Sequence, residues 1–97
     1  MPRATTSPML FYVYVLESDS DGKRYIGFTS NLRKRIEEHQ RGKSFSTKYR
    51  LPMKIIYLEG CISEVDARRR EKYLKSTRGN RFLVKRLIDY YKNKAKL

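Results

Sequence analysis

The alternation of apolar and polar residues along the chain predicts three strands. Residues 10–18, LFYVYVLES, are aromatic and β-branched, and apolar side chains on both faces of a strand favour a central place in a sheet. Asp21 and Gly22 follow as a hairpin turn signal, so residues 23–29, KRYIGFT, are expected to return antiparallel to the first strand. A third strand is predicted over residues 54–60, KIIYLEG.

Helical spacing of apolar residues follows in three stretches. A first helix is capped by Ser30 or Asn31, whose side chains can accept a hydrogen bond from a free backbone amide, and it stops at Gly42. A second helix is predicted over residues 63–76 and a last helix over residues 81–94, with the sequence TRGN as the break between them.

These elements, in the order ββαβαα, predict an α+β fold in which a small central antiparallel three-stranded sheet is flanked by helices. At 97 residues the chain forms one domain. The domain is expected over residues 10–93. Residues 1–9, with two prolines and small polar side chains, are predicted to be a disordered tail, and residues 94–97 a basic C-terminal end.

The charge of the chain narrows its partners. Lys and Arg total 23 against 10 acidic residues, a net charge of +13, so polyanions are the natural partners, although charge alone does not choose between nucleic acid and lipid. The longest near-apolar run, residues 9–16, falls far short of the roughly 20 residues of a spanning helix, so no membrane segment is expected. The single cysteine, Cys61, can form no internal disulfide and favours a cytoplasmic setting.

Several polar residues fall on faces that the pattern predicts to be buried. Arg35 and His39 lie on or beside the apolar stripe of the first helix, and Glu71 lies within that of the second. A half-buried carboxylate is costly unless a cation, a metal ion or hydrogen bonds compensate it. A simple salt bridge with the neighbouring basic residues is an equally good explanation of Glu71 from the residues alone.

Two tyrosines of the predicted hairpin are placed to act together. Tyr14 and Tyr25 lie about equally far from the turn, so they are expected to be cross-strand neighbours on one face of the sheet. Gly27 lies on that face and offers no side chain, which leaves room for a substrate backbone. Together with the inward arginine, histidine and carboxylate, such a face is suited to binding a phosphodiester.

Four short motifs occur in one order along the chain: VYV at 13–15, YIG at 25–27, NLRKRIEEH at 31–39 and ARRREKYLK at 67–75. In order and approximate spacing they resemble the GIY-YIG nuclease domain family, most closely its small stand-alone bacterial members. The resemblance covers about residues 10–90. It implies a metal-dependent nuclease that hydrolyses DNA phosphodiester bonds, with Mg²⁺ or Mn²⁺ as cofactor.

The resemblance also implies a role for each matching residue. Tyr14 and Tyr25 match the two motif tyrosines; one would act as general base or hold the attacking water, and the other would position the water or the phosphate. Arg35 would stabilise charge on the phosphate in the transition state. His39 would bind phosphate or assist proton transfer, and Glu71 matches the metal ligand, where a single carboxylate plus waters and substrate oxygens suits Mg²⁺.

Some positions depart from the family pattern. The first motif is VYV rather than GIY, which leaves Tyr12 as an alternative to Tyr14, although the alternation along the strand favours Tyr14. Phe28 stands where some relatives have a lysine, so phosphate contact is expected from the basic loop after the first helix. The predicted substrate-binding residues are Gly27, Lys48, Arg50 and Asn80, the last matching an asparagine late in the domain of some relatives.

The leading hypothesis is a DNA endonuclease with little intrinsic sequence specificity, selective for DNA structure or acting in repair. The main alternative is a non-catalytic nucleic-acid-binding module on the same fold, for which the charge and the tyrosines suffice. A third is an adaptor bound to a repair partner protein. The inward glutamate favours an enzyme, because a pure binding module does not need it. The sequence leaves the oligomeric state and the physiological substrate open.

Overall fold

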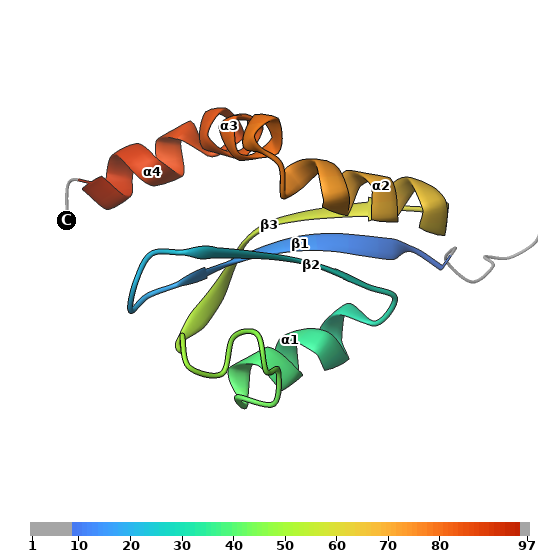
Figure 1. The fold of residues 1–97 in the computed structure, drawn as a ribbon, viewed down its shortest axis with the longest axis horizontal. Helices are drawn as coiled ribbons and strands as arrows, with labels where there is room; N and C mark the ends of the chain where they lie inside the picture. Colours follow the sequence, from blue (N-terminus) through green and yellow to red (C-terminus); the bar gives the residue numbers. More distant parts are fainter. Residues whose placement is uncertain (1–8, 96–97) are drawn as a thin grey trace, which may run out of the picture.

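A computed structural model describes residues 9–95, which form a three-stranded sheet with helices on both faces (Figure 1). The elements are β1 (Phe11–Ser18), β2 (Arg24–Thr29), α1 (Leu32–Gln40), β3 (Met53–Cys61), α2 (Glu64–Leu74), α3 (Thr77–Arg86) and α4 (Ile88–Ala95). The α+β class and the antiparallel sheet are as predicted. The predicted tail lies outside the described residues except for Met9, as do residues 96–97 of the predicted basic end.

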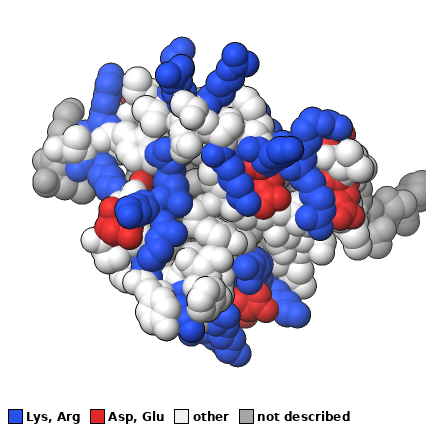
Figure 2. Space-filling model, in the orientation of Figure 1, with Lys and Arg blue, Asp and Glu red and all other residues white. Residues whose placement is uncertain are grey.

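Basic side chains cover more of the visible surface than acidic ones do (Figure 2). Figure 2 shows Lys and Arg spread over the face seen in Figure 1, with smaller groups of Asp and Glu between them. The spread of positive charge over the helices and the loops agrees with the net charge of +13. Within residues 9–95, no helix is both long enough and apolar enough to cross a membrane.

The sheet has the strand order β2-β1-β3, so β1 is central, as its apolar character on both faces predicts. The turn between β1 and β2 places Gly22 at φ +71°, a left-handed conformation that glycine adopts without strain. The register pairs Tyr14 with Gly27 and Leu16 with Tyr25. Tyr14 and Tyr25 therefore share a face as predicted, but they are diagonal neighbours and not direct cross-strand partners.

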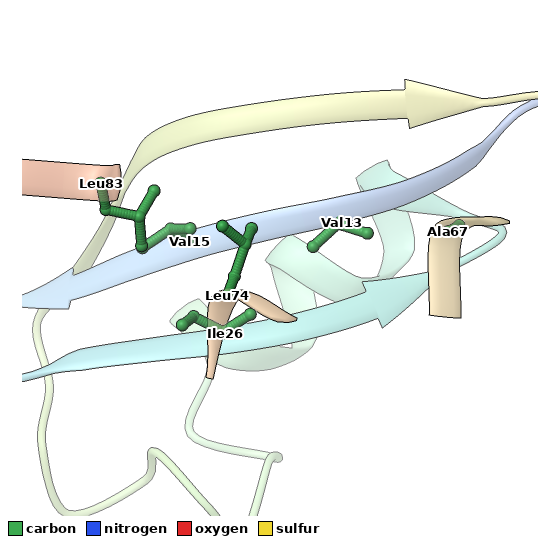
Figure 3. Close-up of a cluster of buried hydrophobic side chains, with 6 residues drawn as sticks. All are labelled: Val13, Val15, Ile26, Ala67, Leu74 and Leu83. Carbon is green, nitrogen blue, oxygen red and sulfur yellow. The ribbon is translucent and has the colours of Figure 1, made fainter. Parts of the chain in front are cut away.

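Alternate residues of β1 enter two separate cores. On one face, Tyr14 and Leu16 pack with α1 and with Met53 at the start of β3. On the other face, six buried side chains join the sheet to the helices α2 and α3 (Figure 3): Val13, Val15, Ile26, Ala67, Leu74 and Leu83. The two-sided burial explains why β1 shows no polar face, and it separates α1 from α2 by the thickness of the sheet.

The sequence TRGN, predicted as a break, is instead the first turn of α3. Ser76 caps this helix by accepting a hydrogen bond from the backbone N–H of Gly79 at 3.1 Å. A Cβ atom on Gly79 would collide with the backbone of Tyr73 and Leu74. Gly79 therefore allows the start of α3 to pack against the end of α2, and its cost in helix propensity is offset by that close approach.

The predicted last helix is two helices, because the chain turns at Leu87 and the order of elements becomes ββαβααα. No residue of α4 is buried. Its attachment is polar: the carboxylate of Glu17, at the end of β1, accepts hydrogen bonds from the three side chains of α4 that reach it. The donors are Tyr90 at 2.5 Å, Tyr91 at 3.0 Å and Lys94 at 2.7 Å.

Replacement of this buried carboxylate should loosen α4. Glu17 is 1% exposed, and Glu17→Ala should lower the free energy of unfolding by about 2 to 4 kcal/mol, because the hydrogen bonds from α4 lose their common acceptor. Urea unfolding measures the change. The control Glu37→Ala removes an exposed carboxylate from α1 and should change stability by no more than about 0.5 kcal/mol. Equal effects of the two substitutions would contradict the role of Glu17.

Candidate active site

The hydroxyl of Tyr14 is the centre of a polar cluster on the α1 face of the sheet. It lies 2.9 Å from Nε2 of His39 and accepts a hydrogen bond of 3.2 Å from Nε of Arg35. Arg35 and His39 are one turn apart on α1, so both side chains lie over the same part of β1. Tyr14 and His39 are fully buried. The inward placement that the helical spacing predicts for Arg35 and His39 is therefore observed.

The ring of Tyr14 occupies the space above Gly27. A Cβ atom on Gly27 would collide with the hydroxyl and the ring carbons of Tyr14, so this position in β2 must be glycine for the phenol to fit there. The sequence predicts that Gly27 leaves room for a substrate backbone. In the structure that room is filled by Tyr14, and Gly27 acts through the tyrosine that it accommodates.

Burial and charge set the protonation of the cluster. Burial raises the pKa of Tyr14 to about 12, against the opposing effect of the Arg35 guanidinium. Burial and the same guanidinium lower the pKa of His39 to about 4. Burial lowers the pKa of Arg35, but its hydrogen bonds to Glu38 and Tyr14 outweigh this effect, so the pKa is raised overall. At neutral pH the cluster therefore holds a neutral phenol, a neutral imidazole and a charged guanidinium.

These protonation states fix the direction of the hydrogen bonds. The Tyr14 hydroxyl accepts from Arg35, so its own proton is best donated to Nε2 of His39. The imidazole then carries its proton on Nδ1, which lies 2.7 Å from Oγ1 of the buried Thr47 and donates to it. This tautomer follows from satisfying each buried polar atom. The hydrogen bonds that run from Arg35 through Tyr14 and His39 to Thr47 join α1, β1 and the loop before β3.

Of the two motif tyrosines, only Tyr25 reaches the surface. Its ring lies 6.2 Å from that of Tyr14 and 5.0 Å from that of His39, between ring centroids. Tyr14 has no exposed surface, whereas Tyr25 is partly exposed. The side chain of Arg35 is 30% exposed and is also paired with Glu38 at 3.1 Å. Tyr25 and Arg35 are thus the members of this group that a solvent-borne ligand can contact.

Glu71 lies on the other side of the sheet. It belongs to α2, between the buried residues Ala67 and Leu74, and its carboxylate is 20% exposed and 3.1 Å from the ammonium of Lys75. Lys75 is mostly exposed, so this ion pair is weak enough to be replaced. Arg68, one turn earlier, lies 4.0 Å above the ring of Phe28 on the edge strand β2. Glu71 is therefore not in contact with the Tyr14 cluster.

The donor set suits only a loosely held metal ion. Among residues 9–95, no group of three or more His, Cys, Asp or Glu side chains could hold a metal. A single partly exposed carboxylate is the arrangement that Mg²⁺ accepts, since this ion keeps several waters and takes further oxygens from its substrate. Glu71 fits that description, and Mn²⁺ would bind by the same oxygen ligands.

The predicted substrate-binding residues Lys48, Arg50 and Asn80 are engaged with the protein. Lys48 lies over two exposed aromatic rings of its own loop. Arg50 donates to the backbone oxygen of Arg24 at 3.3 Å and is 3.7 Å from Asp21. Asn80 accepts from Arg24 at 2.8 Å and lines a groove of about 710 Å³ along α3, on the other side of the sheet from Tyr14. Arg50 and Asn80 therefore hold the β1–β2 hairpin in place.

Ser44 and Thr47 belong to the site although the sequence does not single them out. Both are buried, and they bond to Arg35 at 3.4 Å and to His39 at 2.7 Å. They lie in a loop without periodicity, where small hydroxyl residues are common. The only signal in the sequence is their position after a helix that carries inward polar residues, and this signal predicts a nearby partner without identifying it.

The chain belongs to the GIY-YIG catalytic domain family, whose pattern matches residues 10–87. Membership indicates a function of the nuclease type. The chain is 45% identical over 65 residues to a UPF0213 protein of Streptococcus pneumoniae serotype 4, covering 66% of this chain and 65% of that protein. It is 38% identical over 73 residues to a UPF0213 protein of Clostridium perfringens, covering 74% and 77% respectively. The match thus spans slightly less than two thirds of the S. pneumoniae protein.

A solved structure supports the fold. The solution NMR structure of a UPF0213 protein from Bacillus halodurans is 35% identical, covers 92% of this chain and 97% of that one, and has a TM-score of 0.55. The names of these relatives state no activity, so the chemistry must be argued from the site itself.

The low pKa of His39 gives a direct test of the cluster. The protein has one histidine, so its ring signals in an NMR titration are unambiguous. They should show no protonation between pH 8 and 5.5, since the pKa of His39 is lowered to about 4. In the unfolded chain, the histidine binds a proton near pH 6.5. The stability that the neutral imidazole contributes to the folded protein is therefore fully present above that pH and is lost as the pH drops toward 4. A folded-state midpoint near 6.5 would contradict the buried, neutral imidazole.

Proposed function

We propose that this chain is a metal-dependent DNA endonuclease that hydrolyses phosphodiester bonds with little intrinsic sequence specificity. The observation that carries the proposal is the contact between the charged guanidinium of Arg35 and the buried hydroxyl of Tyr14 beside the partly exposed phenol of Tyr25. This places a fixed cation and a polar surface group on one face of a basic protein. Hydrolysis of a phosphodiester needs such a pair: a positive charge that stabilises the phosphate oxygens and a group that accepts a proton from the attacking water.

Tyr25 is the phenol that we assign to the attacking water. It is the motif tyrosine with exposed surface, so it can hold a water molecule in hydrogen-bond reach. Its phenolate form would take the proton of that water during attack and become the neutral phenol. Arg35, partly exposed and held in place by three polar partners, stabilises the charge that develops on the phosphate oxygens. A preorganised cation is effective because it needs no rearrangement as the reaction proceeds.

Tyr14 and His39 act as positioning residues. Both are fully buried, so neither touches a substrate in this conformation. The Tyr14 hydroxyl holds Arg35, and the neutral His39 accepts from Tyr14 while it bonds to Thr47. These hydrogen bonds hold the Arg35 guanidinium beside the hydroxyl of Tyr14, on the face of the sheet that also carries Tyr25.

Glu71 is the residue that would hold Mg²⁺ or Mn²⁺. When bound, the ion would neutralise charge on the phosphate and on the leaving oxygen. The placement of Glu71 on α2, with its neighbour Arg68 over Phe28, associates it with the edge strand β2. Tyr25 belongs to the same edge strand. A phosphodiester that follows the open edge of β2 would therefore meet Tyr25 and Arg35 from one face of the sheet and Glu71 from the other.

Nicking of supercoiled plasmid tests the proposal. The wild-type protein should cut in Mg²⁺ or Mn²⁺ and stop when the metal is chelated. Arg35→Ala should reduce the rate by about 10²- to 10³-fold, since it removes a stabiliser of transition-state charge, and Tyr25→Phe by about 10²- to 10⁴-fold, since it removes the acceptor for the water proton. Glu71→Gln should abolish cleavage at every concentration of Mg²⁺ or Mn²⁺, since it removes the carboxylate that would hold the ion.

A matched variant controls for loss of positive charge. Arg33→Ala removes an exposed arginine from the same helix, away from the Tyr14 cluster, and should change the rate by less than about threefold. Unfolding curves of all variants separate lost chemistry from lost structure. Cleavage that survives in both Arg35→Ala and Glu71→Gln would overturn the mechanism. DNA binding by a folded wild-type protein that never cuts would favour the non-catalytic binding module instead.

A further inference from the structure

The loop between α1 and β3 exposes two aromatic rings. Phe45 is 80% exposed and Tyr49 is 83% exposed, although rings of this size are normally buried or half-buried. The loop is ordered by its own backbone: the N–H of Lys48 donates to the carbonyl of Ser44 at 2.9 Å, and the N–H of Arg50 donates to that of Thr47 at 2.9 Å. The two rings are thus displayed on a structured turn.

The same loop is fixed to the candidate active site by its buried residues. Ser44 accepts a hydrogen bond from Arg35, and Thr47 is bonded to His39. Phe45 follows Ser44 directly, so its Cα lies about 3.8 Å from that of a residue in contact with Arg35. Inward-facing hydroxyl residues therefore alternate with outward-facing aromatic residues, and the position of the rings is coupled to that of the guanidinium.

The chemistry around the rings is that of a nucleic-acid contact. The ammonium of Lys48 lies 5.0 Å from the ring centre of Phe45 and 4.9 Å from that of Tyr49. Exposed cation–π contacts of this kind are weak, so another flat group can displace the lysine from the rings. Aromatic rings beside cations bind single strands, because each base stacks on a ring while the cation meets a phosphate. A paired base inside duplex DNA has both faces covered by its neighbours.

We propose that Phe45 and Tyr49 form a stacking platform for unpaired DNA bases beside the scissile phosphate, with Lys48 moving from the rings to the backbone phosphate. The substrate class is then single-stranded or locally unpaired DNA. This inference rests on the proposed nuclease function. It assigns the selection of the substrate to Phe45, Lys48 and Tyr49. Residues 9–95 contain no second domain that could select it instead.

A tryptophan reporter tests the platform without any cleavage. The chain contains no tryptophan, so Tyr49→Trp places one indole on the proposed platform. In EDTA, a single-stranded oligonucleotide should quench this fluorescence at saturation by at least about twofold, because the indole stacks on bases, and a blunt duplex should leave it nearly unchanged. Ile62→Trp, at an exposed position after β3, is the matched control and should show no quenching with either DNA.

Alanine variants test the contribution to affinity. Phe45→Ala and Tyr49→Ala should each weaken binding to single-stranded DNA by about 5- to 50-fold and binding to duplex by less than about twofold. Tyr49→Phe keeps the ring and should restore binding. Ile62→Ala removes an apolar side chain that is 70% exposed and should change neither. Fluorescence anisotropy in EDTA measures all four variants, and their unfolding curves confirm that each is folded.

Three results would overturn the platform. The first is single-strand binding that is unchanged in the Phe45→Ala, Tyr49→Ala double variant. The second is an equal loss on single-stranded and duplex DNA, which would indicate a general electrostatic effect. The third is a mass in light scattering that rises with protein concentration and falls in the double variant while DNA binding stays constant, because the rings would then contact a second copy of the chain. Tighter binding to RNA than to DNA would overturn the assignment of DNA.

The tests of the stacking platform can succeed or fail independently of the tests of nuclease activity. Binding and quenching are measured in EDTA and need no turnover, so a protein that stacks unpaired bases but never cuts DNA supports the platform and refutes the enzyme. A protein that cuts single-stranded and duplex DNA equally, with or without Phe45 and Tyr49, supports the enzyme and refutes the platform.

Discussion

The buried hydroxyl of Tyr14 is the interaction on which the candidate site depends. It joins the central strand to Arg35 and His39 of α1, and through His39 to Thr47 of the following loop. A buried hydroxyl without partners is costly, so the fold gains from satisfying it, and the same bonds hold a charged guanidinium at the surface. Gly27 makes the arrangement possible because the ring lies where its side chain would be. Stability and the geometry of the site are therefore linked through one phenol.

The position of this phenol divides the work between the two motif tyrosines. A group with no exposed surface and a pKa raised to about 12 is poorly suited to meet water or phosphate, and it is well suited to hold its neighbours in place. Tyr25, on the edge strand, differs in being partly exposed, and its ring lies beside those of Tyr14 and His39. The sheet in turn separates this group from Glu71, so a phosphodiester that uses both must lie along the edge of β2.

Much of this architecture can be predicted from the sequence, for physical reasons that differ between elements. The hairpin follows from the Asp21–Gly22 turn, the central place of β1 from its apolar character on both faces, and the inward side of α1 from helical spacing. The start of α3 and the turn at Leu87 do not follow, because they depend on tertiary contacts: the close approach at Gly79 and the reach of α4 to Glu17. The roles of Ser44 and Thr47 are equally hidden, since a polar loop has no period that marks an inward residue.

The role of the Tyr14 hydroxyl is tested most directly by a crystal structure of the Tyr25→Phe protein bound to uncleaved DNA in the presence of Mg²⁺. We expect a phosphate at the edge of β2 within hydrogen-bond distance of the Arg35 guanidinium, with the Tyr14 hydroxyl still buried and in contact with His39. A phosphate bonded to the Tyr14 hydroxyl, or bound away from Arg35 altogether, would contradict this role.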